Sequence, residues 1–150
     1  MQRAPALQDF LERLEAALVP RLVAGTPEQE MVAGLFRRLA TPAPADATEA
    51  PERPAPGVLR QALRNAAAGE ADLAALAEAF GRLEPSLPWR RGRRTPGPGE
   101  PLDLHVTIVG SRGMEKRSDG EIGVSLLEPH CTYVDHHHPP DEGYLVLSPG

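Results

Sequence analysis

The stretch Tyr133-Val-Asp-His-His-His-Pro-Pro-Asp-Glu-Gly-Tyr144 carries most of the information about the fold of this chain. His136 and His138 are two residues apart, so on an extended strand both imidazoles leave the same face. The Pro-Pro-Asp that follows predicts a turn, because two fixed φ angles cannot continue a central strand. Glu142 and Tyr144 are again two residues apart. We therefore predict a β-hairpin that brings two imidazoles, a carboxylate and a phenol to one point.

This set of donors predicts a metal site. Nitrogen and oxygen ligands together suit one divalent transition metal such as Zn, Fe, Mn or Ni. The alternative is a solvated polar turn or a purification-tag remnant, but a tag usually sits at a terminus, with more histidines and no matched carboxylate. The flanking residues 124–127 and 144–147 are typical of strands rather than linkers. The pattern His-x-His-x-x-x-Glu is similar to the first metal-binding motif of the cupin β-barrels.

Longer stretches carry a narrower resemblance. Met114-Glu-Lys-Arg117, residues 122–129 and residues 133–150 resemble the cupin-type dimethylsulfoniopropionate (DMSP) lyases. The helical region that ends in Leu87-Pro88-Trp89 is similar to the same family. The resemblance spans most of the chain from 87 to 150, whereas the first part agrees mainly in being helical.

The resemblance implies a role for each residue of the hairpin. His136, His138 and Glu142 would hold the metal, and Tyr144 would sit beside it. Tyr133 would line the pocket and bind substrate, although its odd separation from the histidines requires a bulge in the strand. The family's fourth protein ligand, a histidine on a later strand, has no counterpart in this sequence.

The resemblance also implies a reaction: a carbon–sulfur lyase that splits DMSP into dimethyl sulfide and acrylate by β-elimination. A metal on the substrate carboxylate would act as a Lewis acid, and a base would remove the α proton. Tyrosine has an ordinary pKa of about 10, and an adjacent cation favours the phenolate. Tyr144 is our first candidate for the base and Tyr133 the second. The sulfonium would lie against an aromatic face, which Tyr133 or Trp89 could provide.

Two other classes of function stay open. A different metal-binding cupin, such as a dioxygenase or an isomerase, would share the ligands but would not require Tyr144. A non-catalytic cupin binding module is the second alternative, because one fold hosts many functions.

Helical spacing organises the first two thirds of the chain. An apolar stripe from Leu7 to Leu18 predicts a helix that Pro20 ends, and Thr26-Pro27 predicts the start of the next. Two more helices are predicted over 58–68 and 70–80. Residues 41–57 contain five prolines and no apolar periodicity, so we predict a mobile linker there.

The predicted fold class is therefore α+β, with a helical region over 1–101 and the first strands of a cupin-like antiparallel β-barrel over 102–150. Four strands are predicted over 102–109, 122–127, 132–138 and 143–147. A closed barrel needs about eight strands and roughly 60 residues. We therefore expect these 150 residues to be the front part of a longer protein, with an incomplete barrel and an incomplete, inactive site.

Composition excludes several classes of partner. The net charge of −5 and pI of about 5.5 argue against nucleic acid, and we predict that the basic run 90–94 is a solvated loop. No apolar run is long enough to span a membrane, and no signal-peptide core follows Met1. The single cysteine, Cys131, fits a reducing compartment. We expect a cytoplasmic bacterial enzyme acting on a small molecule, with a homodimer left open.

Overall fold

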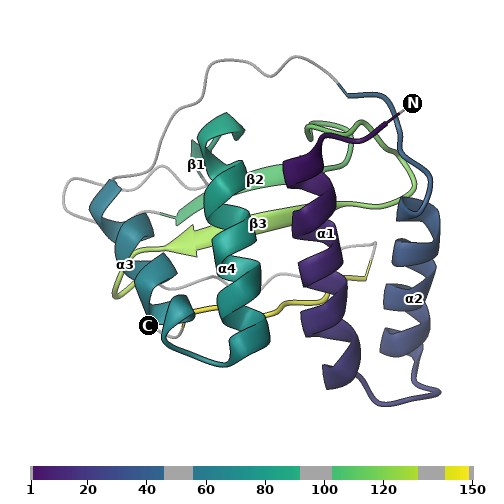
Figure 1. The fold of residues 1–150 in the computed structure, drawn as a ribbon, viewed down its shortest axis with the longest axis horizontal. Helices are drawn as coiled ribbons and strands as arrows, with labels where there is room; N and C mark the ends of the chain where they lie inside the picture. Colours follow the sequence, from purple (N-terminus) through teal and green to yellow (C-terminus); the bar gives the residue numbers. More distant parts are fainter. Residues whose placement is uncertain (1, 46–55, 92–102, 132–140, 149–150) are drawn as a thin grey trace.

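The computed structural model describes residues 2–45, 56–91, 103–131 and 141–148, and in it a layer of helices covers one face of an antiparallel sheet (Figure 1). The helices are α1 (Pro5–Leu18), α2 (Pro27–Leu39), α3 (Pro56–Ala67) and α4 (Ala71–Leu83), with short 3-10 turns η1 (Val19–Arg21) and η2 (Glu84–Ser86). The strands are β1 (Arg90–Arg91), β2 (Asp103–Val109) and β3 (Ile122–Leu127). The α+β class is thereby confirmed.

The four predicted helices are all present, with their ends shifted by a few residues. Helix α2 begins as its sequence predicts: Thr26 is the N-cap, its hydroxyl accepts a hydrogen bond from the Gln29 amide, and Pro27 occupies the first turn. Helix α1 likewise starts at a proline and buries Leu7, Phe10 and Leu11. None of the helices in the described ranges is long and apolar enough to cross a membrane.

The sheet has the order β1-β2-β3, with both pairs antiparallel. Strand β2 alternates between side chains buried beneath the helices and half-buried ones, so Leu104, Val106 and Ile108 share a core with α1 and α4. Cross-strand partners on β3 continue this pattern, because Leu126 lies opposite Leu104. Within the described residues the sheet is open, and a closed barrel is not part of this structure.

Two sequence predictions about strands are wrong. Arg90 and Arg91, predicted to lie in a solvated loop, form β1 and pair with His105 and Leu104 of β2, although their side chains are exposed. Residues 143–147, predicted as a strand, have an irregular backbone without ladder pairing. The predicted strand over 132–138 lies outside the described residues.

The predicted linker over 41–57 differs in its two described parts. At its start, the Lys116 amide donates to the Pro44 carbonyl at 2.8 Å, and Ala45 forms an isolated bridge with Glu115. At its end, helix α3 already begins at Pro56. The stretch between them, 46–55, lies outside the described residues.

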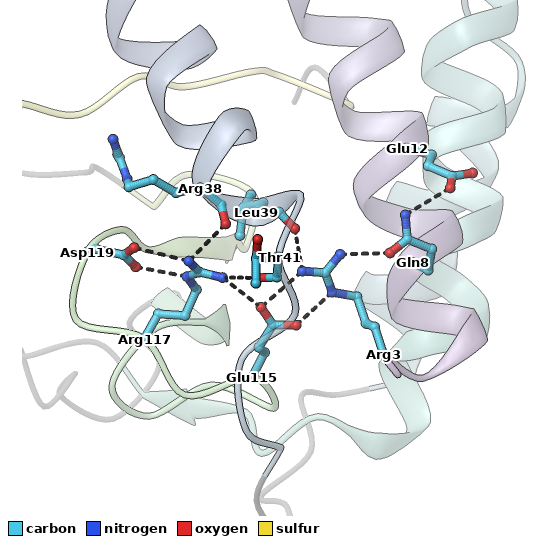
Figure 2. A network of polar contacts seen from close by, with 9 residues as sticks. All are labelled: Arg3, Gln8, Glu12, Arg38, Leu39, Thr41, Glu115, Arg117 and Asp119. Atoms are coloured by element: carbon cyan, nitrogen blue, oxygen red, sulfur yellow. Dashed lines mark hydrogen bonds and ion pairs between the residues drawn. The ribbon is translucent and has the colours of Figure 1, made fainter. Parts of the chain in front are cut away.

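A buried carboxylate joins three distant parts of the chain (Figure 2). Glu115, in the connection between β2 and β3, is 1% exposed. Arg3 approaches both of its oxygens, with Nε 2.6 Å from Oε2 and a terminal nitrogen 3.0 Å from Oε1, and Arg117 lies 3.2 Å from Oε1. Burial raises the pKa of Glu115, but hydrogen bonds from Arg3, from the Ala43 amide and from Arg117 outweigh burial and hold this pKa below its ordinary value.

The same two guanidinium groups cap the carboxyl end of α2. Arg3 donates to the Leu39 carbonyl at 2.6 Å, and Arg117 donates to the carbonyls of Arg38 at 2.9 Å and Thr41 at 2.8 Å. The last carbonyls of a helix have no partner inside it, and they favour cations. We call Arg3, Glu115 and Arg117 the arginine–glutamate network; it fixes the end of α2 to the β2–β3 connection.

Candidate active site

Glu142 and Tyr144 lie together on the described segment 141–148. The Tyr144 hydroxyl donates a hydrogen bond to Oε2 of Glu142 at 2.6 Å, and both side chains are exposed. Two residues on one face of an extended chain can meet in this way. The prediction that Glu142 and Tyr144 share a face is therefore confirmed.

The burial of the neighbouring residues shows which way this face points. Leu145 and Leu147 are partly buried and pack against the helical core, whereas Tyr144 is 66% exposed and Val146 is 68% exposed. Burial thus alternates from one residue to the next along 144–147, as on a strand, although this segment forms no hydrogen-bonded ladder. The carboxylate and phenol therefore face away from the helices, where a small molecule can reach them.

His136, His138 and Tyr133 fall in 132–140, outside the described residues. In the part of the chain that the structure describes, no three His, Cys, Asp or Glu side chains gather as a metal site would require. Of the predicted ligand set, the structure thus describes Glu142 alone. The two histidine ligands and the second tyrosine stay predictions.

Trp89, predicted to contact substrate, lies in the core. It is 1% exposed, its indole N–H donates to Oε1 of Glu84 at 3.0 Å, and its ring meets Phe80 edge-on with centroids 6.2 Å apart. These contacts join η2 and α4 at the entry to β1. The ring offers no solvent-facing surface here, so a substrate contact of Trp89, which stays a prediction, would require this packing to open.

The turn before the histidine-rich stretch has an unusual backbone. The Cys131 amide donates to the Glu128 carbonyl at 3.0 Å, with Pro129 second in the turn and His130 third at φ 66°. A type II turn needs a positive φ at its third position, where glycine is usual. Cys131 is a free, half-buried thiol.

A family model described as dimethylsulfoniopropionate lyase matches residues 28–150. This chain belongs to the DMSP lyase family. The match begins one residue into α2 and continues through the segment that carries Glu142 and Tyr144, so both residues of the candidate site belong to the family region. Comparisons with curated proteins and with solved structures gave no match.

The match to the DMSP lyase family begins after the amino-terminal helix α1, so α1 lies outside the family region. Its packing partner α4 and the whole sheet lie inside that region. Arg3 also precedes it, while Glu115 and Arg117 lie within it. The arginine–glutamate network thus joins a residue before the family region to two residues inside it.

Proposed function

We propose that this protein takes part in the cleavage of DMSP to dimethyl sulfide and acrylate by β-elimination. The observation that carries the proposal is the hydrogen bond between the exposed Tyr144 phenol and Glu142, within a chain that belongs to the DMSP lyase family. A phenolic oxygen held at a fixed position is one requirement for a base that removes a carbon-bound proton.

The residues present fit a divalent transition metal. Glu142 offers a solvent-exposed carboxylate, and the two predicted imidazoles of His136 and His138 would complete a mixed nitrogen and oxygen set that Zn, Fe, Mn or Ni accept. When bound, such an ion supplies Lewis-acid stabilisation of the charge that develops on the substrate carboxylate. A cupin barrel around the hairpin belongs to the same proposal.

In the proposed reaction Tyr144 first loses its own proton, a loss that an adjacent bound cation would favour, and the phenolate then accepts the proton on the carbon next to the substrate carboxylate. The electron pair of that C–H bond forms the carbon–carbon double bond of acrylate, and the bond from the β carbon to sulfur breaks. Its electron pair leaves with sulfur as neutral dimethyl sulfide, so the departing group needs no proton. Before Tyr144 loses its proton, its hydrogen bond to Glu142 holds the phenolic oxygen in place, and Tyr133 offers the substrate an aromatic face for its sulfonium.

Product analysis tests this function directly. The metal-supplemented protein is incubated with DMSP, dimethyl sulfide is measured in the headspace and acrylate in solution, and oxygen uptake is recorded in parallel. Equal release of both products without oxygen uptake supports the lyase. Oxygen uptake, or metal binding with no product from DMSP, would instead favour a dioxygenase or a binding module.

The metal part of the proposal has its own test. His138→Ala should lower the bound metal per chain measured by elemental analysis, because an imidazole ligand is removed. His105→Ala is the matched control, since His105 lies on β2 opposite Ser125 and Arg90 rather than in the predicted hairpin. Unchanged metal affinity and stoichiometry in His138→Ala would show that the metal binds elsewhere.

A further inference from the structure

Helix α2 lies at one side of the molecule (Figure 1), and its buried side chains belong to the common core. Val32, Phe36 and Leu39 are buried in the common core. One turn of the β2–β3 connection also lies close to α2, because a Cβ atom on Gly120 would be 2.6 Å from Cδ1 of Leu35. A larger residue at 120 would therefore push the end of the Leu35 side chain aside.

The carboxyl end of α2 is fixed by charge as well as by the apolar packing of Phe36 and Leu39. Arg117 reaches the carbonyls of Arg38 and Thr41 while its other side makes two hydrogen bonds to Asp119, at 2.8 and 3.0 Å. Arg3 holds the Leu39 carbonyl and Glu115 together (Figure 2). Because these guanidinium groups make several charge-assisted hydrogen bonds at once, they hold this end of α2 against the β2–β3 connection.

Near the other end of the same helix, Met31 meets the candidate active site. A Cβ atom on Gly143 would lie 3.7 Å from Cε of Met31, which is ordinary van der Waals contact. Gly143 stands between Glu142 and Tyr144 in the chain. Met31 is partly buried and packs against the common core, and its methyl group lies near the backbone of Gly143, which is itself exposed.

Side chains along 142–147 point alternately toward and away from the helices, so the position of Gly143 affects the direction of Glu142 and Tyr144. Gly143, Leu145 and Leu147 are every second residue of the segment; the two leucines pack against the helical core, whereas Gly143 is exposed. Glu142, Tyr144 and Val146 are the residues that alternate with them, and all three are exposed. In a segment without ladder hydrogen bonds such contacts help to hold the register, because a shift by one residue exchanges the two faces.

Building on the proposed function, we propose that α2 positions the catalytic segment: Met31, supported by the arginine–glutamate network, holds Gly143 so that Glu142 and Tyr144 face the substrate. Met31 is a positioning residue and touches neither substrate nor metal. A misplacement of about 1 Å in a catalytic group can cost roughly 100-fold in rate. Loss of this contact is therefore expected to lower turnover.

The contact itself is tested by NMR of the full chain labelled with carbon-13 at the methionine methyl groups. The chain has three methionines, so Met31 can be assigned by substitution. We expect a nuclear Overhauser effect between the Met31 methyl and the α protons of Gly143. Gly143→Ala should shift the Met31 methyl resonance and leave that of Met114 in place. Absence of both effects would overturn the proposal whatever the enzyme does.

The positioning role is tested in the Tyr133→Phe background, where Tyr144 is the only tyrosine. Met31→Ala should narrow the Tyr144 ring signals as the segment gains mobility, and Met31→Leu should restore the wild-type line widths. Leu73→Ala is the matched control, because Leu73 is also partly buried against the core but lies on α4. Ring signals that respond equally to Met31→Ala and Leu73→Ala would reduce Met31 to a general packing residue.

The kinetic test uses the metal-loaded protein with Tyr133 intact. Met31→Ala should lower kcat about 10-fold with little change in KM, because alignment is lost while substrate contacts remain. Met31→Leu should recover most of kcat, and Leu73→Ala should leave it near the wild-type value. Equal kcat in Met31→Ala and wild type would refute the proposal. An intact, full-length wild-type protein that releases no dimethyl sulfide would refute the proposed function, while the two NMR tests still decide whether α2 holds the segment.

Discussion

Tyr144 and Glu142 show how a single hydrogen bond can hold an exposed side chain in one position. The phenol is 66% exposed, yet its oxygen is held 2.6 Å from a carboxylate oxygen rather than free to rotate in solvent. The arrangement joins the candidate base to a candidate metal ligand. Changing either residue should therefore separate effects on turnover from effects on metal binding.

Tyr144→Phe removes only the phenolic oxygen. If Tyr144 is the base, we expect turnover of DMSP to fall about 100-fold or more, with metal content close to wild type. Dimethyl sulfide release and elemental analysis on the same preparation measure both quantities. Tyr133→Phe is the parallel variant: greater loss there than in Tyr144→Phe would make Tyr133 the base. If both variants keep near-normal turnover, a mechanism in which a tyrosine is the base is refuted.

His130 shows a different residue-scale effect, because its backbone adopts a conformation that suits glycine. The left-handed region costs a non-glycine residue about 1–2 kcal/mol, while glycine costs roughly 0.5–1 kcal/mol through the flexibility of the unfolded chain. With φ at 66°, His130→Gly should stabilise the protein by a fraction of a kcal/mol up to about 1 kcal/mol.

Urea unfolding of His130→Gly and His105→Gly checks this expectation. His105 lies in the extended strand β2, so the same substitution there should destabilise the protein. If the two variants lose stability equally, the backbone at His130 is not strained.

At the scale of elements, the sequence predicted the helices well because their determinants are local. Thr26 and Pro27 define the start of α2, and the spacing of Leu7, Phe10 and Leu11 defines the buried face of α1. Strands β2 and β3 were also predictable from their apolar runs. A two-residue strand such as β1 has no periodicity of its own, so only its pairing with His105 and Leu104 reveals it.

The segment over 143–147 explains why one strand prediction was wrong while the prediction about its faces was right. Alternating burial requires only a surface on one side, which the helical layer provides for Leu145 and Leu147. A strand also requires a hydrogen-bonded neighbour, which no property of these five residues determines. The same limit applies to Met31: its apolar character predicted burial, but its contact with Gly143 depends on the tertiary fold.

The N-cap of α2 gives a prediction at this scale. Thr26→Ala should destabilise the protein by about 1 kcal/mol, because the Gln29 amide loses its hydroxyl partner. Thr26→Ser retains that partner and should be nearly neutral. Thermal unfolding of the three proteins measures the difference, and equal losses in Ala and Ser would assign the effect to the lost methyl group instead.

For the whole molecule, the arginine–glutamate network joins the amino terminus, the end of α2 and the β2–β3 connection. Sequence reasoning used Met114-Glu-Lys-Arg117 only as a mark of resemblance, because the partner of Glu115 lies 112 residues away at Arg3. No local pattern indicates such a pairing. Breaking a buried ion pair by removing one partner typically costs about 3–5 kcal/mol.

The network predicts how stability changes with pH. The pKa of Glu115 in the folded protein lies below the ordinary value of 4.5. Its contribution to stability is therefore fully present above about pH 4.5 and is lost as the pH falls through the folded-state pKa. Glu115→Gln should be less stable at pH 7 by about 3 kcal/mol, with a flatter decline in acid.

Urea unfolding at pH 7 and at stepwise lower pH distinguishes this effect from general charge repulsion. Asp9→Asn is the control: Arg82 lowers the pKa of Asp9 by a hydrogen bond, but that pair lies at the surface. Solvent screens such pairs, so Asp9→Asn should leave the pH profile almost unchanged. An acid decline that persists unaltered in Glu115→Gln would place the responsible carboxylate elsewhere.

Arg3 and Glu115 are 112 positions apart in the sequence, and this separation also imposes an order in time. A ribosome adds about 5–20 residues each second, so Glu115 is made roughly 6–22 s after Arg3. During that interval α1 and α2 can form, but the Leu39 carbonyl and the Arg3 guanidinium have no Glu115 to meet. The nascent helices therefore exist first without their anchor, and the last strands of the described sheet arrive together with the residue that fastens them.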